Sequence, residues 1–196
     1  MIEVEKNFDL RPGDKERLIR NAEFVGRKSF TDVYYDTPNF SLTRRDYWLR
    51  TRNGKFELKV PLNQEGINSR KTDQYKELET DEEIARKLNL NVKAVLPAQL
   101  ADKVYKPFAT ITTARETYRK GDFHLDFDET DFGFSTFEAE LMVKDISEVS
   151  AAESKIIEFA KVHGISGTEA HGKVIEHIFR RNPEHYKVLL EAGVVE

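Results

Sequence analysis

The sequence predicts an α+β fold in which an eight-stranded antiparallel β-barrel (a tunnel) with a charged interior is flanked by helices. Eight segments alternate apolar and polar residues with the period of a strand, and few helices separate them, which favours antiparallel pairing. Charges of one sign are also sorted by strand, as facing patches of opposite sign inside a barrel would require. An ordinary half-exposed sheet, polar side outward, is the alternative.

Turn signals separate the eight expected strands. Gly54 and Gly121 lie between neighbouring runs, where tight hairpins favour a positive φ. The window 63–72 is expected to be a polar loop. The expected strands are Ile2–Phe8, Arg27–Tyr35, Tyr47–Thr51, Lys55–Val60, Gln74–Glu79, Thr110–Tyr118, Asp122–Asp128 and Thr136–Val143.

Helices are predicted from capping residues and apolar periodicity. Asp14 is expected to cap the first helix. Thr80 with Glu83, and Ser150 with Glu153, each have the spacing of a capping box. The expected helices are Lys15–Phe24, a short one after Thr80 that ends near Leu88, Pro97–Val104, Ala151–His163 before Gly164, Thr168–Arg181, and a final turn or two from Pro183.

Length and composition exclude several classes of protein. The 196 residues predict a single domain spanning 1–196, and the absence of Cys excludes disulfide scaffolds and thiolate chemistry. A net charge of −4 argues against nucleic-acid binding, and no apolar run approaches the ~20 residues of a membrane span. With no signal-peptide pattern at the start, we expect a cytoplasmic protein with no membrane partner. Charged residues form 34% of the chain, against a typical ~25%, so the surplus needs an explanation.

The sorted charges suggest that explanation. Residues of like charge stand two positions apart in four strands, so each two share one face of their strand. They are Glu3 and Glu5, Arg50 and Arg52, Asp126 and Asp128, and Glu138 and Glu140. Carboxylates at positions i and i+2 lie ~6.6–7 Å apart, so two such pairs can surround a small cation. All-oxygen ligation favours Mg²⁺ or Mn²⁺, and arginine suits phosphate. The sequence therefore predicts a metal-dependent polyphosphate site.

A series of motifs follows in a specific order along nearly the whole chain. They are Glu3-Val4-Glu5, Tyr34-Tyr35-Asp36-Thr37-Pro38, Trp48-Leu49-Arg50 with Arg52, Glu57-Leu58-Lys59, Tyr75-Lys76-Glu77-Leu78, Asp126-Phe127-Asp128 with Asp131-Phe132-Gly133, Glu138 with Glu140, and Lys173. This order resembles the CYTH domain, the family of triphosphate tunnel metalloenzymes. Within that family the spacing is most similar to the animal-type thiamine triphosphatases.

The resemblance implies a monomeric enzyme that uses Mg²⁺ to hydrolyse thiamine triphosphate, a small-molecule substrate, to thiamine diphosphate and phosphate. It implies catalytic roles for Tyr34 and Lys173, and it implies that Trp48 stacks on the organic part of the substrate. The implied metal ligands are Glu3, Glu5, Asp126, Glu138 and Glu140. The implied triphosphate-binding residues are Arg50, Arg52, Lys59, Arg115 and Lys173.

One position departs from the family's E-x-E-x-K signature. Asn7 stands where the signature has Lys, and Lys6 points to the opposite face of its strand. In the family this Lys is understood to activate the tyrosine that Tyr34 matches, and a neutral Asn cannot do so by Coulomb attraction. The alternatives are an inorganic tripolyphosphatase of the same fold, the adenylate-cyclase branch of the family, and a module that binds polyphosphate without cleaving it.

Overall fold

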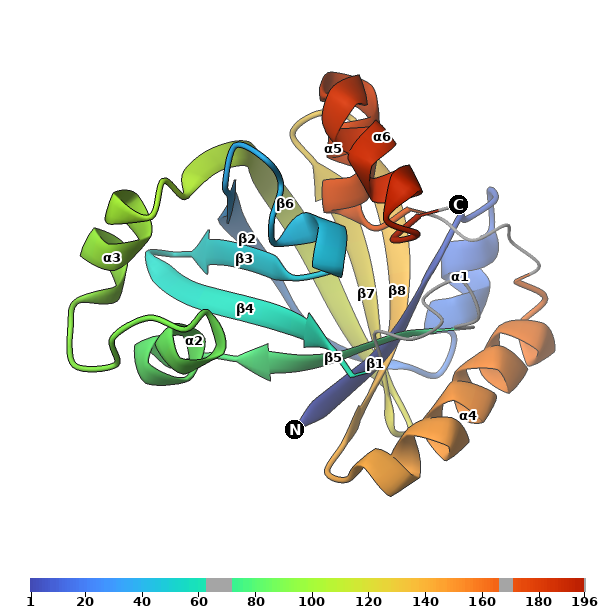
Figure 1. Ribbon diagram of the computed structural model, residues 1–196. Coiled ribbons are helices and arrows are strands. Elements are labelled where there is room, and N and C mark those ends of the chain that lie inside the picture. Colours follow the sequence, from blue (N-terminus) through green and yellow to red (C-terminus); the bar gives the residue numbers. More distant parts are fainter. Residues whose placement is uncertain (63–71, 166–170, 196) are drawn as a thin grey trace. The chain divides into compact units, whose positions relative to one another are not determined.

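The computed structural model describes residues 1–62, 72–165 and 171–195. Within these residues eight strands form a closed barrel in the order β1-β5-β4-β3-β2-β6-β7-β8, flanked by helices (Figure 1). The strands are β1 (Ile2–Phe8), β2 (Glu23–Asp36), β3 (Trp48–Arg52), β4 (Lys55–Pro61), β5 (Asp73–Leu78), β6 (Lys106–Lys120), β7 (Phe123–Thr130) and β8 (Ser135–Val143). The predicted antiparallel barrel and all eight predicted strands are confirmed.

The chain divides into two compact units. Unit 1 comprises Met1–Phe30, Arg70–Gln74 and Thr112–Glu176, and unit 2 comprises Thr31–Ser69, Tyr75–Ile111 and His177–Glu196. Strands β2, β5 and β6 each cross a boundary, so each contributes residues to both units.

Unit 1 is built on the ladder of β1, β8 and β7, which continues into β6. Helix α4 (Val149–Val162) lies along β1 and β8 (Figure 1). Four apolar side chains of these elements are fully buried: Val4, Leu125, Phe137 and Ile156. Because successive strand residues point to opposite faces, this packing leaves the charged residues of the same strands on the face away from it.

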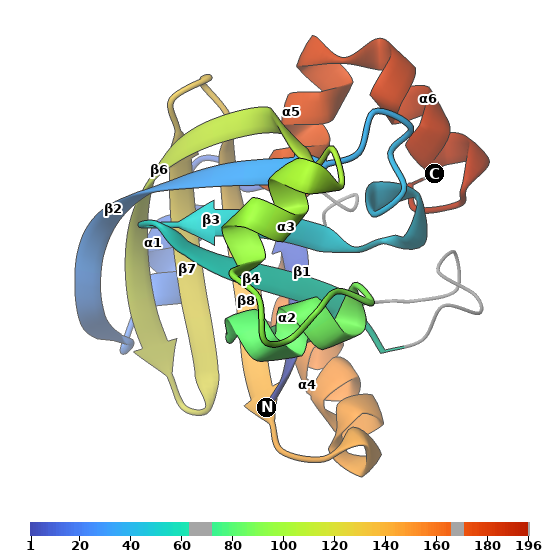
Figure 2. The ribbon, with the colours of Figure 1, turned by 60° about the vertical axis from the view of Figure 1, so that its left-hand side comes forward.

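Unit 2 contains a second apolar core. Leu42, Leu49, Leu58, Ile84 and Leu96 are at most 1% exposed and belong to one cluster. They come from the turn before β3, from β3 and β4, and from helices α2 (Asp81–Lys87) and α3 (Leu96–Asp102), which lie beside these strands (Figure 2). Helix α6 (Pro183–Glu191) contacts the 3-10 helix η1 (Thr43–Arg45) in the same unit.

Two of the predicted helix starts are wrong. Asp14 does not cap α1 (Asp14–Ile19): it is the first helical residue, and its carboxylate accepts the backbone N–H of Arg11 at 2.9 Å. The helix also ends five residues earlier than predicted, because Asn21 turns the chain with a φ of 61° and β2 begins at Glu23. The apolar spacing up to residue 24 therefore belongs partly to a strand.

Helix α4 is capped by a different pair of residues from the predicted one. The 3-10 helix η3 (Ile146–Glu148) precedes it, and Asp145 with Glu148 forms the capping box there. Ser150 and Glu153 lie inside α4, and the Glu153 carboxylate instead accepts hydrogen bonds from Thr72 at 3.0 Å and Gln74 at 3.1 Å. Because the helical segment already begins at the capping box of Asp145 and Glu148, the backbone N–H groups near Ser150 and Glu153 lie inside the helix and need no cap.

Other local predictions are confirmed. Thr80 caps α2 by accepting the Glu83 N–H at 3.3 Å, and Gly54, Gly121 and Gly164 have φ values of 80°, 62° and 64°. Helix α5 (Lys173–Arg181) matches the end of the predicted helix 168–181. The start of that helix, residues 168–170, and the expected loop up to residue 71 lie outside the described residues. None of the described helices is long and apolar enough to cross a membrane.

Candidate functional site

An acidic face lies on unit 1, on the side of the strands away from α4. We define it as the carboxylates of Glu3, Glu5, Asp126, Asp128, Glu138 and Glu140 together with Arg115 and Lys173. Strand register brings them side by side: Glu5 is opposite Glu140, Asp126 is opposite Glu138, and Asp128 is opposite Arg115. Like charges directly opposite each other repel, so this face needs compensating cations.

Three members of the acidic face form a cluster with the geometry of a cation site. Glu3, Glu5 and Glu140 each place one carboxylate oxygen so that the three oxygens lie within 4.8 Å of one another. Glu3 and Glu5 share a face of β1, and Glu140 reaches them from β8 through the pairing of Glu5 with Glu140. Three carboxylate oxygens at this spacing suit a hard divalent cation such as Mg²⁺.

The two other predicted metal ligands have a different partner. The guanidinium of Arg115 forms ion pairs with Asp126 and, at 2.6 Å, with Glu138. It also makes a two-pronged contact with Asp128, with Nε and Nη2 each 2.6 Å from a carboxylate oxygen. The structure therefore separates the five predicted ligands into a three-carboxylate cluster and a pair that surrounds Arg115.

Asp128 connects the two cations of the acidic face. Its Oδ2 accepts Arg115 and also the Nζ of Lys173 at 2.8 Å, and the Asp128 side chain is fully buried. Lys173 is the first residue of α5, so this contact fixes the start of that helix against β7. The sequence shows Asp128 two residues after Asp126 on the same face, but its role as the link between these cations depends on tertiary contacts.

Burial sets the electrostatics of this face. Burial, Glu138 and Asp128 raise the pKa of Asp126 above its ordinary value, although Arg115 and Thr117 oppose the shift. For Arg115, burial alone would lower the pKa, but the surrounding carboxylates hold it well above its ordinary value. The carboxylates thus keep the arginine charged, while their own mutual repulsion is only partly relieved.

Asn7, the departure from the family signature, is a buried member of the same sheet. It lies opposite Glu138, and its Oδ1 accepts a hydrogen bond from Thr136 at 3.4 Å. Its Nδ2 lies 3.7 Å from the position that a Cβ on Gly172 would occupy. A neutral amide therefore occupies a position beside an acidic residue and next to the start of α5.

An arginine face lies on unit 2, on the side of β3 and β4 away from the apolar cluster. We define it as Arg50, Arg52 and Lys59 with the carboxylates of Asp32, Glu57 and Glu77. Arg50 contacts Glu57 at 2.8 Å and Glu77 at 3.3 Å. Arg52 makes a two-pronged contact with Asp32 at 2.7 and 2.8 Å, and Lys59 lies 4.0 Å from Glu77. Each predicted phosphate-binding cation of this face is thus held by a carboxylate.

Arg50 lies opposite both Glu57 and Tyr34 in the strand register. Burial alone would lower the pKa of Arg50, but electrostatic interaction with Tyr34 and with the carboxylates of Asp32, Glu57 and Glu77 holds it well above its ordinary value. Tyr34 is 3% exposed, and its ring lies 6.2 Å from that of Phe108. The predicted catalytic tyrosine and the predicted phosphate-binding arginine are therefore neighbours in unit 2.

Trp48 lies on the same side of β3 as Arg50 and Arg52 of the arginine face. It lies opposite Lys59, whereas its neighbours Tyr47 and Leu49 are part of the apolar cluster. Its indole N–H donates to Asp46 at 2.8 Å, and the Tyr75 hydroxyl donates to the same oxygen at 2.8 Å.

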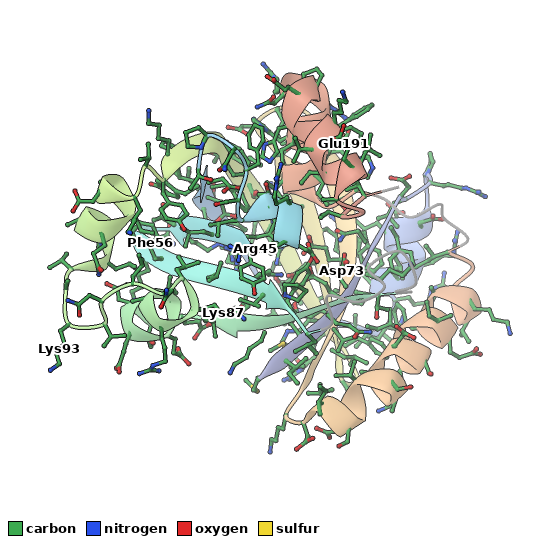
Figure 3. The ribbon with its side chains drawn as sticks, in the orientation of Figure 1. Arg45, Phe56, Asp73, Lys87, Lys93 and Glu191 are labelled. Atoms are coloured by element: carbon green, nitrogen blue, oxygen red, sulfur yellow. The ribbon has the colours of Figure 1, made fainter. Side chains whose placement is uncertain are left out.

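Arg45, by contrast, lies outside the arginine face. Figure 3 labels Arg45 and Lys87, both exposed, whose charged groups lie 4.8 and 5.1 Å from the centre of the Tyr47 ring. Tyr47 is part of the apolar cluster and comes immediately before Trp48 in the chain. The two cations therefore pack on the ring of a core residue and are not among the residues that hold Arg50, Arg52 and Lys59.

Sequence reasoning missed Asp32, and it placed Asp128 on the face of Asp126 without identifying it as the partner of two cations. Asp32 and Asp128 are buried, and both bind an arginine through two contacts. Asp32 lies two residues before the predicted Tyr34 on the same strand, so alternation is a signal that could have found it. Asp46 carries no such signal, because it lies in a turn.

Comparison with known proteins identifies the family of this chain. The model of the CYTH domain matches residues 1–171. The thiamine-triphosphatase of Homo sapiens is 32% identical over 211 residues, covering 98% of this chain and 91% of that protein.

Solved structures share the fold. A protein of Pyrococcus horikoshii OT3 matches with a TM-score of 0.65 and 20% identity, over 91% of this chain and 99% of that one. A putative adenylate cyclase from Vibrio parahaemolyticus matches with a TM-score of 0.62 and 16% identity, over 92% and 98%. The structures support the barrel, and the family match and the human relative together establish that the chain belongs to the CYTH domain family.

Proposed function

We propose that this chain is a Mg²⁺-dependent phosphohydrolase that removes the terminal phosphate of thiamine triphosphate. The observation that carries the proposal is the acidic face, with its three-oxygen cluster and its buried cations, in a chain 32% identical to a thiamine-triphosphatase. The proposal extends to the substrate and the metal, which the family alone leaves open.

The residues present fit a divalent cation. Glu3, Glu5 and Glu140 would hold it, because their oxygens lie within 4.8 Å of one another and offer the hard ligands that Mg²⁺ prefers. Asp126 and Glu138, which contact Arg115, would complete the surroundings of the metal rather than form its centre. A cation bound there supplies charge neutralisation for the phosphate oxygens and polarises the phosphorus toward attack.

The cations of both faces would bind the triphosphate. Carboxylates hold these cations in fixed orientations, which reduces the conformational entropy that binding must remove. The cations are Arg50, Arg52, Lys59, Arg115 and Lys173. Phosphate oxygens would replace part of these carboxylate contacts, and arginine forks suit such two-pronged binding. The arrangement therefore favours a highly charged anion over a singly charged one.

The proposed reaction is an in-line displacement at the terminal phosphorus. A water oxygen forms a bond to that phosphorus, and the bridging P–O bond breaks. The bridging oxygen keeps the electron pair and leaves on thiamine diphosphate. Tyr34 would orient or deprotonate the water, and Lys173 would stabilise charge on the phosphate oxygens.

Turnover of three substrates with Mg²⁺ tests this proposal: thiamine triphosphate, inorganic tripolyphosphate and ATP. The full chain should release phosphate from thiamine triphosphate, and the Glu5→Gln variant should lose that activity. A matched control is Glu116→Gln, a carboxylate on the opposite face of β6 that pairs with Lys15 at 2.7 Å. Hydrolysis of tripolyphosphate with no preference for the thiamine substrate would favour the inorganic tripolyphosphatase.

A second candidate function follows from Asn7, the neutral residue at the signature position. A module that binds polyphosphate without cleaving it would show binding but no phosphate release from any of the three substrates. The Asn7→Lys variant separates the two functions. We expect both the native chain and this variant to hydrolyse the thiamine substrate, with the variant faster at alkaline pH.

A further inference from the structure

We infer that Asp46 is a positioning residue that fixes the indole of Trp48 for the organic part of the substrate. The inference rests on the proposed function, because it concerns how the chain prefers thiamine triphosphate over a purely inorganic triphosphate. Asp46 would not touch the reacting phosphate; it would act through Trp48.

The Asp46 carboxylate holds two aromatic side chains, those of Trp48 and Tyr75. Its Oδ1 accepts the Nε1–H of Trp48 at 2.8 Å and the hydroxyl of Tyr75 at 2.8 Å. Asp46 is 1% exposed and Trp48 is 5% exposed, so water competes little for these hydrogen bonds. Bonds from neutral donors to a buried carboxylate are among the stronger hydrogen bonds in proteins.

The backbone aims this carboxylate. Asp46 ends the 3-10 helix η1 in the left-handed region, with φ 59° and ψ 32°, and its N–H donates to the Thr43 carbonyl at 2.9 Å. A non-glycine residue seldom adopts this conformation, although Asp and Asn tolerate it best. The turn brings the side chain of Asp46 back to Trp48, two residues further along the chain.

Fixing the indole matters because of where the ring lies. Trp48 is opposite Lys59 and shares a strand face with Arg50, both proposed phosphate-binding residues. The χ2 torsion of tryptophan is broad, and the hydrogen bond from Nε1 selects one orientation of the ring plane. A carboxylate acceptor also increases the electron density of the indole, which strengthens its attraction for a cationic ring such as that of thiamine.

A purely structural role for Asp46 predicts a different pattern of defects. Structural damage would reduce turnover of every substrate by a similar factor. A positioning role affects substrates that contact the indole, and inorganic tripolyphosphate has no organic part to contact it. The ratio of kcat/KM for thiamine triphosphate to that for tripolyphosphate therefore distinguishes the two roles.

The test compares Asp46→Ala, Asp46→Asn and Tyr75→Phe with the native chain, using both substrates. We expect Asp46→Ala to lower the ratio about tenfold, mainly through KM for the thiamine substrate, the scale of one hydrogen bond to a charged acceptor. Asp46→Asn keeps an acceptor oxygen and should restore part of the ratio. Tyr75→Phe should lower it less, and Tyr105→Phe, a phenol packed beside the apolar cluster, is its matched control.

Fluorescence provides a second readout, because Trp48 is the single tryptophan of the chain. Thiamine triphosphate should quench its emission in the native chain and do so less in Asp46→Ala. Equal losses on both substrates, together with unchanged quenching, would overturn the positioning role. Failure of the native chain to hydrolyse thiamine triphosphate would instead overturn the proposed function, and quenching by the thiamine compound would still decide the role of Asp46.

Discussion

The acidic face of unit 1 and the arginine face of unit 2 differ in how their charges are balanced. On the acidic face six carboxylates accompany Arg115 and Lys173, whereas on the arginine face three cations accompany Asp32, Glu57 and Glu77. A buried surplus of one sign is costly, so a cation bound at the acidic face would relieve part of that surplus. The arginine face is already balanced, and its carboxylates serve to orient the cations.

The difference shows in the ionisable groups at the centre of each face. Burial and neighbouring carboxylates raise the pKa of Asp126, so this group gives up its proton less readily than usual. The pKa of Arg50 is instead raised by the carboxylates around it, which stabilise its charged form. One face therefore holds an excess of carboxylates, and the other holds arginines that carboxylates keep charged.

The first prediction compares the stability that two arginine–aspartate pairs contribute, Arg115 with Asp128 and Arg52 with Asp32. Asp128→Asn should destabilise the protein by about 3–5 kcal/mol, because it leaves Arg115 and Lys173 without their shared carboxylate. Asp32→Asn on the arginine face should cost less, because the Arg52 side chain is 20% exposed and can turn toward water. Urea unfolding of the two variants measures the difference. Equal losses would contradict the idea that the acidic face is the more tightly coupled one.

The second prediction tests whether the need for a cation belongs to the acidic face alone. Glu5→Gln should lower kcat/KM by about 100-fold or more, the scale of losing a preorganised electrostatic partner, and raise the Mg²⁺ concentration for half-maximal activity. Glu57→Gln on the arginine face should alter substrate KM but leave the Mg²⁺ requirement where it was. Magnesium titrations at saturating substrate measure this. A shifted requirement in both variants would break the distinction.

The third prediction concerns how the stability of unit 2 falls at acid pH, and it assigns this loss to His185, which lies outside the arginine face. Burial lowers the pKa of this histidine to about 4, although Asp36 opposes the shift. Thr43 gives its hydroxyl proton to Asp36, so His185 Nε2 donates to Thr43 at 2.8 Å. The ring is stacked on Phe40 at 3.9 Å, and within the described residues Nδ1 has no hydrogen-bond partner that could stabilise a charge.

Because its folded pKa lies below the ordinary 6.5, the unfolded chain takes up the proton first as pH falls. The stabilisation is complete above pH 6.5 and is lost as pH falls toward 4, by about 2 kcal/mol between pH 6.5 and 5. Urea unfolding of the native chain and of His185→Phe across this range measures it. The variant should show a flatter slope. A native slope matched by the variant would assign the acid sensitivity to other groups.

The smallest effect comes from a residue that belongs to neither face. Thr80→Ala removes the N-cap of α2 and should cost about 1 kcal/mol of unfolding free energy. It should change neither the Mg²⁺ requirement nor the substrate KM, because α2 packs on the apolar side of β4. Thermal unfolding and steady-state kinetics measure the two quantities. An altered Mg²⁺ requirement would mean that overall stability, rather than the acidic face, sets the response to metal.

Strand positions were predictable because alternation is a local signal. Glu3 and Glu5, or Arg50 and Arg52, share a face whatever the strand pairs with, and the structure places both pairs as expected. Helix starts were less predictable, since two overlapping capping signals near 145–153 compete and only one can begin a helix.

Strand parity and positive φ act within a few residues, so the eight strands, the turns at Gly54 and Gly121 and the face on which each charge lies follow from local sequence. Which carboxylates share a partner depends on contacts between strands. Arg115 on β6 meets Asp126 and Asp128 on β7 and Glu138 on β8, whereas Glu140, two residues further along β8, joins Glu3 and Glu5 of β1. These partners lie far apart in the chain, and the register that joins them is set by packing across the whole sheet.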